Sequence, residues 1–198
     1  DERLALMLVC THPAIAPDLH APMILQCVLG LHAHDIARLF SVSPAALAKR
    51  LVRAKTKLRA AGAAFSMPDP AALPTRADAL FEAVYGLHAH DWLDPGEAQG
   101  EEALFLADLL ARLLPANAEA HGLAALIAFG HARRDARVVE GELVPLERQD
   151  CARWDGWLTR YAQGQLSRAQ TLAAPGRFQT EAAIQAVHMA RAHSGRID

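Results

Sequence analysis

Apolar residues recur every three or four positions along almost the whole chain, which is the spacing of residues on one face of an α-helix. The alternation of β-branched residues that is typical of strands is scarce. The one strand-like stretch is "RVVEGELV" at 137–144, where we expect a short hairpin around Gly141. The pattern predicts an all-α protein, with helices over 4–10, 18–29, 33–40, 44–61, 74–90, 100–114, 117–133, 147–164 and 178–193.

Glycine, proline and capping residues divide this pattern. Gly30 ends the second helix, and Ser43 followed by Pro44 is a favourable start for the fourth, because serine caps a helix and proline suits its first position. Helices 33–40 and 44–61 therefore predict a helix-turn-helix. Three prolines in "AFSMPDPAALP" indicate a linker. We expect a helix-turn-helix domain at 1–66 and a helical domain at 67–198. The helix pairs of the second domain are similar to tetratricopeptide repeats in architecture, although no clear repeat length is apparent.

Composition places the chain among globular proteins. It has 198 residues, of which 52% are hydrophobic and 21% charged. No apolar run is long enough for a membrane helix and no signal peptide is recognisable, so we expect a cytoplasmic protein without a membrane partner. Three widely spaced cysteines argue against a disulfide framework and fit a reducing compartment. The chain opens on Asp1, so we expect a fragment of a longer protein.

Charge is distributed unevenly. The net charge is -2, but the window 36–68 holds seven basic residues and no acidic one, so it carries +7 while the remainder sums to -9. All three lysines of the chain lie within this window. A local excess of this size indicates a polyanionic partner. The alternative is a solvated helix face without a partner.

The helix at 44–61 has two distinct faces. Leu47, Leu51, Ala54 and Leu58 form one apolar stripe, and the basic residues lie mainly on the other side. This arrangement lets one face pack while the other enters a DNA groove. We predict that Arg50 and Arg53 contact base edges, that the remaining basic residues contact phosphates, and that Ser41 and Ser43 lie near a phosphate. The predicted DNA-binding residues are Ser43, Ala46, Lys49, Arg50, Arg53, Lys55, Lys57 and Arg59.

The hexapeptide "GLHAHD" occurs at 30–35 and again at 86–91. We favour chance or local convergence over a metal site, because His32 and His34, two positions apart, are expected on different helix faces. No metal site, cofactor or catalytic residue is predicted, since no catalytic or nucleotide-binding motif is present and the carboxylates are dispersed. Trp154 and Trp157 are expected in the core, although an exposed tryptophan there could anchor a partner.

The stretch "APMILQCVLGLHAHDIARLFSVSPAALAKRLVRAKTKLRAAG" resembles region 4 of extracytoplasmic-function (ECF) RNA polymerase sigma factors. The segments "LALMLVCTHPAIAP", "ARLLPANAEAHGLAALI", "HARRDARVVEGELVPLERQDCARWD" and "AAIQAVHMA" resemble one ECF subgroup with a helical C-terminal extension. The resemblance covers nearly the whole chain. It implies recognition of the promoter minus-35 element, docking on the β flap of the RNA polymerase core, and a tetratricopeptide-like regulatory extension that binds a possible regulator.

The chain also departs from this family. Region 2, which melts the minus-10 element, is absent, so the fragment should not initiate transcription by itself. His32 and Asp35 replace the family's hydroxyl residue and glutamate, and "VYGLHAHDW" replaces a "YLIFNEGY"-like segment. We therefore keep two further hypotheses: a helical protein-interaction or regulatory module without direct DNA binding, and, more remotely, an enzyme with a cleft in the C-terminal half.

Overall fold

The computed structural model describes residues 2–62, 73–93 and 99–194 and divides into two compact units, Asp1–Gln99 and Gly100–Asp198. Helices make up 77% of the structure, and the sheet found among the described residues has two strands. The predicted all-α class is therefore confirmed. Most of the proline-rich stretch that was expected to be a linker lies outside the described residues. No helix in the described ranges combines the length and the apolar character needed to cross a membrane.

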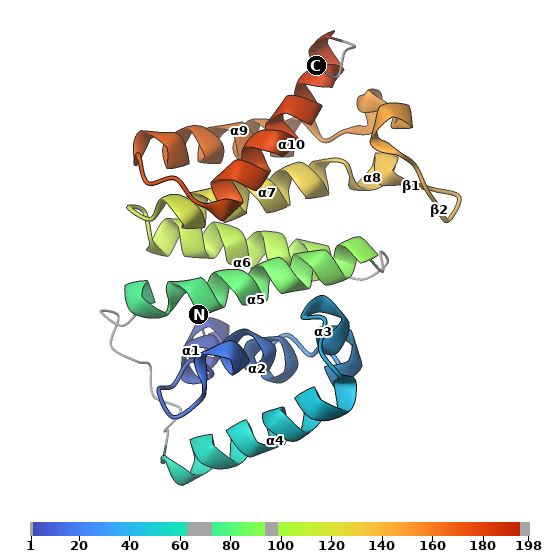
Figure 1. Ribbon diagram of the computed structural model, residues 1–198. Helices are drawn as coiled ribbons and strands as arrows, with labels where there is room; N and C mark the ends of the chain where they lie inside the picture. The colour runs from blue at the N-terminus through green and yellow to red at the C-terminus, as the bar shows by residue number, and fades with distance from the viewer. Residues whose placement is uncertain (1, 63–72, 94–98, 195–198) are drawn as a thin grey trace. The chain divides into compact units, whose positions relative to one another are not determined.

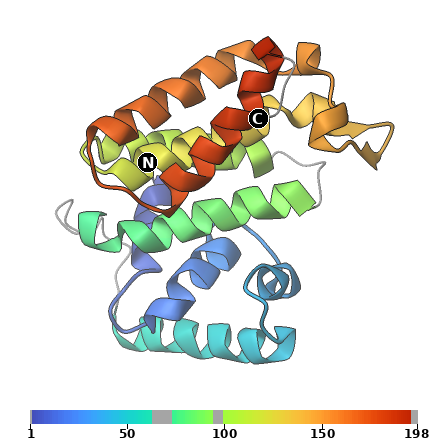
Figure 2. The same cartoon turned by 45° about the horizontal axis from the view of Figure 1, so that its top comes forward.

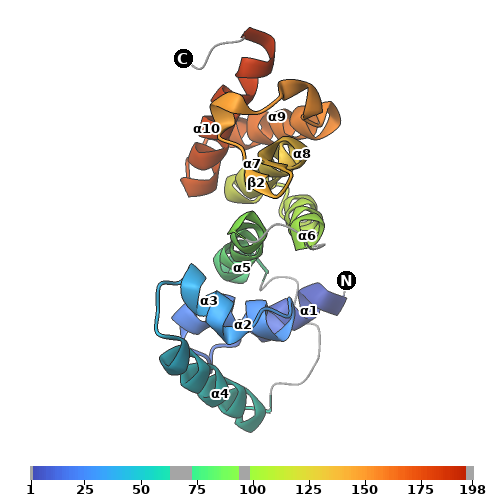
Figure 3. The ribbon, with the colours of Figure 1, turned by 90° about the vertical axis from the view of Figure 1, so that its right-hand side faces the viewer.

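The first unit contains five α-helices and a short 3-10 helix among its described residues (Figure 1). Their bounds are α1 (Glu2–Val9), η1 (Pro17–Leu19), α2 (His20–Cys27), α3 (Ala33–Leu39), α4 (Pro44–Ala60) and α5 (Leu73–Leu93). Within this unit, α1, α2 and α3 lie between α4 and α5, as Figures 1 and 3 both show. The buried side chains Met7, Ile24 and Leu80 come from three of these helices and form part of the core.

Backbone conformation explains the turn after α2. Gly30 has a φ of +75°, the left-handed region that glycine adopts without steric cost. The backbone N–H of Leu31 donates to the carbonyl of Leu25 at 2.9 Å, and the Leu31 side chain is buried. The predicted role of Gly30 as a helix stop is confirmed.

The boundary between the compact units differs from the one expected at residue 66. Helix α5 packs against α1, α2 and α3, so it belongs to the first unit. Helix α5 approaches α2 closely at Gly86, because a Cβ there would lie 3.1 Å from a methyl carbon of Leu25. The boundary expected at residue 66 placed this helix in the second domain because the prolines before it mark a break in the helical pattern. A break in the pattern, however, does not reveal which core the next helix joins.

The second unit contains most of α6 (Gln99–Leu113) and the elements that follow it (Figure 2). These are α7 (Ala118–Ala132), α8 (Arg134–Arg137), β1 (Val138–Val139), β2 (Glu142–Leu143), η3 (Leu146–Arg148), η4 (Cys151–Arg153), α9 (Gly156–Thr171) and α10 (Arg177–Ser194). Helix α7 packs against both α9 and α10 and is buried along almost its whole circumference. An apolar surface on all sides is typical of a central helix.

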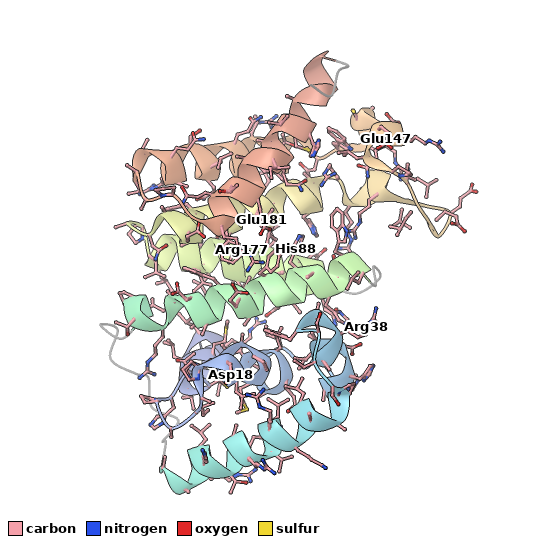
Figure 4. All side chains as sticks on the ribbon, viewed as in Figure 1. Asp18, Arg38, His88, Glu147, Arg177 and Glu181 are labelled. Carbon is pink, nitrogen blue, oxygen red and sulfur yellow. The ribbon has the colours of Figure 1, made fainter. Side chains whose placement is uncertain are left out.

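Helix α10 is joined to α7 by a capping side chain and by a close approach of the two backbones. The carboxylate of Glu119 accepts hydrogen bonds from the backbone N–H groups of Phe178 and Gln179 at 2.9 and 3.2 Å, which caps the first turn of α10. Gly122 allows the two backbones to approach, since a Cβ there would lie 2.7 Å from the backbone nitrogen of Gln179. Figure 4 shows Arg177 and Glu181, which form an ion pair at the start of α10.

The remaining expectations for this unit are partly confirmed. Strands β1 and β2 form the predicted hairpin, in which Glu140 and Gly141 both have positive φ. The helix predicted at 147–164 was wrong at both ends: α9 runs from Gly156 to Thr171. Residues 146–153 form the short turns η3 and η4, and α9 begins at Gly156 because the Asp155 carboxylate accepts from the N–H groups of Trp157 and Leu158.

Candidate nucleic-acid interface

Helix α4 has the two faces that its sequence predicts. Leu47, Leu51 and Ala54 are buried, and Leu58 is half-buried. Val52 on the other side has 64% of its surface exposed. In Figure 2, α4 lies along the edge of the first unit, with α2 and α3 on one side of it only. Its outer face is therefore open to solvent within this unit.

Most of the predicted DNA-binding residues share this open face. Lys49, Arg53 and Lys57 follow one another at intervals of four residues, which places them in a row along the helix. A row of three cations along the helix spans just over two turns, about 12 Å, and can follow a phosphate backbone. The predicted residues that are exposed are Ser43, Ala46, Lys49, Arg53, Lys57 and Arg59.

Arg50 was expected to contact a base edge, but its guanidinium is engaged within the first unit. Its Nη2 donates to a carboxylate oxygen of Asp18, which precedes α2 and is labelled in Figure 4. Both side chains remain partly exposed, with 42% and 63% of their surfaces accessible. The pair is therefore a surface ion pair of small energy, which a phosphate could displace. The sequence could not reveal it, because 32 positions separate the partners.

Lys55 also departs from its expected place. Its side chain is half-buried and lines a cavity together with Cys10 and Cys27, where its charge lowers the pKa of Cys27. A side chain at this position looks toward α1 and α2, away from the row formed by Lys49, Arg53 and Lys57. Lys55 is thus separated from the open face of α4 on which it was expected.

The turn before α4 approaches the open face from its N-terminal end. Ser43 occupies the expected N-cap position, but its side chain accepts no capping hydrogen bond. Its hydroxyl is exposed beside the first turn, where backbone N–H groups favour an anion. Ser41 has a φ of 53°, which lets the chain reverse between α3 and α4. Arg38, in the last turn of α3, is also exposed (Figure 4).

The two copies of the repeated hexapeptide meet in the first unit. His90 of the second copy lies 3.8 Å from the Asp35 carboxylate of the first, measured from Nε2 to Oδ1, and His34 lies 3.2 Å from the same oxygen. The expectation that His32 and His34 diverge was wrong: their rings stack with centroids 5.7 Å apart. The reason is that His32 caps α3 in an extended conformation and is not helical. In the described part of the chain, no three His, Cys, Asp or Glu side chains are grouped so that they could hold a metal ion.

A second exposed feature lies in the second unit, where the sequence left open an exposed tryptophan that anchors a partner. Trp154 is buried as expected, but Trp157 was expected in the core and has 64% of its surface exposed. Its ring stacks on Tyr161, with centroids 5.8 Å apart, beside a cavity of about 260 Å³ that Phe105 also lines. The Tyr161 hydroxyl donates to Asp108 at 2.6 Å, and burial together with this carboxylate raises the pKa of the tyrosine. The capping role of Asp155, two residues earlier, was the signal that Trp157 lies in the exposed first turn of a helix.

Comparison with known proteins finds similarity to a family of unknown function and to an uncharacterized protein. Residues 76–170, from α5 to α9, match the model of a family of unknown function, DUF6596. An uncharacterized protein of Rhizobium meliloti (strain 1021) is 36% identical over an alignment of 195 residues, which covers 95% of this chain and 46% of that protein. The chain therefore spans less than half the length of this relative. No solved structure matches. The relative's similarity includes α4, whereas the family match does not.

Proposed function

We propose that the first unit binds promoter DNA through α4, in the manner of region 4 of an ECF sigma factor, and that the second unit is a helical, tetratricopeptide-like regulatory module without catalysis of its own. The sequence resemblance implies that the minus-35 element is the DNA target and that the β flap of RNA polymerase is the protein partner. In this proposal α3 and α4 form the helix-turn-helix, with α4 as the recognition helix.

The observation that carries the proposal is the open cationic face of α4. Folding requires only the apolar stripe around Leu51, and the opposite face contributes little to the core. The window 36–68 holds seven basic residues and no acidic one, and these positive charges repel each other. Binding of a polyanionic partner would offset this repulsion. Lys49 and Lys57 would neutralise phosphates, and Arg53, near the middle of the row, would read a base edge.

The exposed aromatic groove favours a second candidate function, protein interaction by the second unit. The exposed rings of Trp157 and Phe105 and the half-buried ring of Tyr161 line this cavity beside the carboxylates of Glu101 and Asp108. Aromatic residues of this kind anchor protein interfaces. Such a groove would suit a regulator that presents an apolar and basic segment. This function is compatible with DNA binding by α4 and also stands without it.

The proposal is tested by measuring how α4 discriminates among duplexes. A sequence selected by the full chain from a randomised duplex library is compared with single-base variants of that sequence. Arg53→Ala should lose about 1–3 kcal/mol of discrimination at one base position. Lys57→Ala should weaken all duplexes alike. Arg168→Ala, which removes one exposed positive charge from α9, is the control and should change neither. Unchanged selectivity in Arg53→Ala would remove this residue from base recognition, and equal effects of all three variants would contradict the assignment of α4.

A further inference from the structure

A cavity in the first unit brings two cysteines and a lysine together. Its volume is about 440 Å³, and it lies where the end of α1, the end of α2 and the inner side of α4 meet. Cys10 comes from the turn after α1, Cys27 is the last residue of α2, and Lys55 comes from α4. The other lining residues include Leu6, Val9 and Met23, so the wall around the sulfur atoms is largely apolar.

The two thiols differ in access. Cys10 has 5% of its surface exposed, whereas Cys27 is exposed, and both are free thiols. A small reagent can therefore reach Cys27 from solvent, while Cys10 is reached only through Cys27 or the cavity. This is the arrangement of a reactive thiol with a protected partner behind it.

The charges in the cavity favour a thiolate at Cys27. Cys27 accepts a hydrogen bond from the Cys10 thiol, and the Lys55 ammonium lies near it; these effects outweigh burial and lower the pKa of Cys27 to about 6. The same hydrogen bond and burial raise the pKa of Cys10. Arg59 adds a second cation to the wall, and of the described residues that line the cavity none is acidic. The thiolate is the nucleophilic form of cysteine.

We propose that Cys27 is a hydroperoxide-reactive cysteine and that Cys10 resolves its oxidised form, so that the first unit contains an oxidisable pair of thiols beneath α4. The inference concerns a modification site and does not depend on DNA binding. The wide spacing of the cysteines argued against a disulfide framework, but the fold brings Cys10 and Cys27, 17 positions apart in the chain, to the wall of one cavity.

The reaction proceeds in two balanced steps. The Cys27 thiolate attacks one oxygen of a hydroperoxide, the O–O bond breaks, and hydroxide or alkoxide leaves, so Cys27 becomes a sulfenic acid and the peroxide is reduced. The Cys10 sulfur then attacks the Cys27 sulfur, the S–O bond breaks, and hydroxide leaves with the Cys10 proton as water. With hydrogen peroxide the sum is two thiols and one peroxide giving one disulfide and two waters.

Oxidation of Cys27 also prepares Cys10 for the second step. The largest effect that keeps Cys10 protonated is its hydrogen bond to Cys27, and the negative charge of Cys27 adds to it. The negative charge is lost when Cys27 becomes a neutral sulfenic acid, whereas Lys55, whose charge lowers the pKa of Cys10, remains. Both thiols line the same cavity, and the second step requires their sulfur atoms to approach to the disulfide length of about 2.05 Å.

The first experiment needs no substitution. The rate at which iodoacetamide alkylates each cysteine of the intact chain is followed against pH by peptide mass spectrometry. We expect the rate at Cys27 to reach half its maximum near pH 6, well below the value of about 8.5 for a cysteine in a model peptide. A half-maximum for Cys27 at or above about 8.5 would overturn the proposal.

The second experiment follows oxidation by hydrogen peroxide. The intact chain should lose two hydrogen atoms and yield a Cys10–Cys27 peptide pair that a reductant separates. Cys151→Ser, the control, should form the same pair. Cys10→Ser should stop at a Cys27 sulfenic acid that dimedone traps, and Lys55→Met, which keeps both thiols, should slow the first step severalfold. Circular dichroism checks that each variant remains helical. Exclusive conversion of Cys27 to sulfinic acid in the intact chain, or a disulfide that always involves Cys151, would contradict the role of Cys10.

Discussion

Helices α4 and α7 have similar lengths and opposite surroundings. Of the 17 residues of α4, three are buried, whereas 13 of the 15 residues of α7 are buried. Helix α7 carries no lysine or arginine, and its role is to hold α9 and α10. Helix α4 needs one narrow stripe for folding and keeps a cationic face that folding does not use. The difference separates a helix whose sequence is determined by packing from a helix whose sequence also serves a partner.

The largest expected change in stability distinguishes the buried face of α4 from its exposed face at two neighbouring residues. Leu51 has 1% of its surface exposed and Val52 has 64%. Leu51→Ala should lower the free energy of unfolding by about 2–5 kcal/mol, because it removes buried carbon atoms and leaves a cavity. Val52→Ala should change it by less than about 0.5 kcal/mol. Urea denaturation followed by circular dichroism measures both; similar losses at the two positions would show that both faces of α4 are packed.

The packing of α7 is tested by replacing one glycine in α7 and one in α9 with alanine. The two replacements should change the stability of the protein in opposite directions. Gly122→Ala should destabilise the protein by about 1–3 kcal/mol, because the new Cβ would lie 2.7 Å from the backbone of Gln179. Gly164→Ala in α9, where nothing lies within 4 Å of the new Cβ, should stabilise it by about 0.5–1 kcal/mol. Thermal unfolding of both variants gives the comparison. A neutral Gly122→Ala would show that α7 and α10 do not require this close approach.

The smallest of these effects compares helix starts in the two units. Asp155 caps α9 through two hydrogen bonds of 2.8 and 2.9 Å, whereas the Ser43 side chain makes none at the start of α4. Asp155→Ala should cost about 0.5–2 kcal/mol in the free energy of unfolding. Ser43→Ala should cost clearly less while weakening DNA binding, if its hydroxyl meets a phosphate. A larger stability loss from Ser43→Ala would reveal a capping role and leave the phosphate contact without support.

Local patterns predicted the elements well. The bounds of α4 and α7 lie within two residues of their predictions, because a helix with apolar periodicity, a capping residue and a stop signal is determined by nearby residues. The start of α9 was wrong because the capping role of Asp155 was overlooked, although the residue is visible in the sequence. The membership of α5 in the first unit depends on packing against α2, which no local pattern encodes.

Which side chains of α4 face outward was less predictable, because this also depends on tertiary packing. The apolar stripe and the open row at Lys49, Arg53 and Lys57 follow from helical periodicity alone. The pairing of Arg50 with Asp18, and the position of Lys55 beside two cysteines, require the tertiary arrangement of α1, α2 and α4. Periodicity thus identifies which residues can face a partner, and the fold decides which of them are engaged elsewhere.

The most direct test of the role of α4 is the salt dependence of DNA affinity. For the intact chain, the logarithm of the association constant should fall linearly with the logarithm of salt concentration, by about 0.9 per phosphate contact. Lys49→Ala with Lys57→Ala should flatten this line by about 2, since each lysine supplies one contact. The control, Arg160→Ala with Arg168→Ala, removes two exposed charges from α9 and should leave the slope unchanged. An equal slope for all three proteins would contradict the proposal that DNA binds on this face of α4.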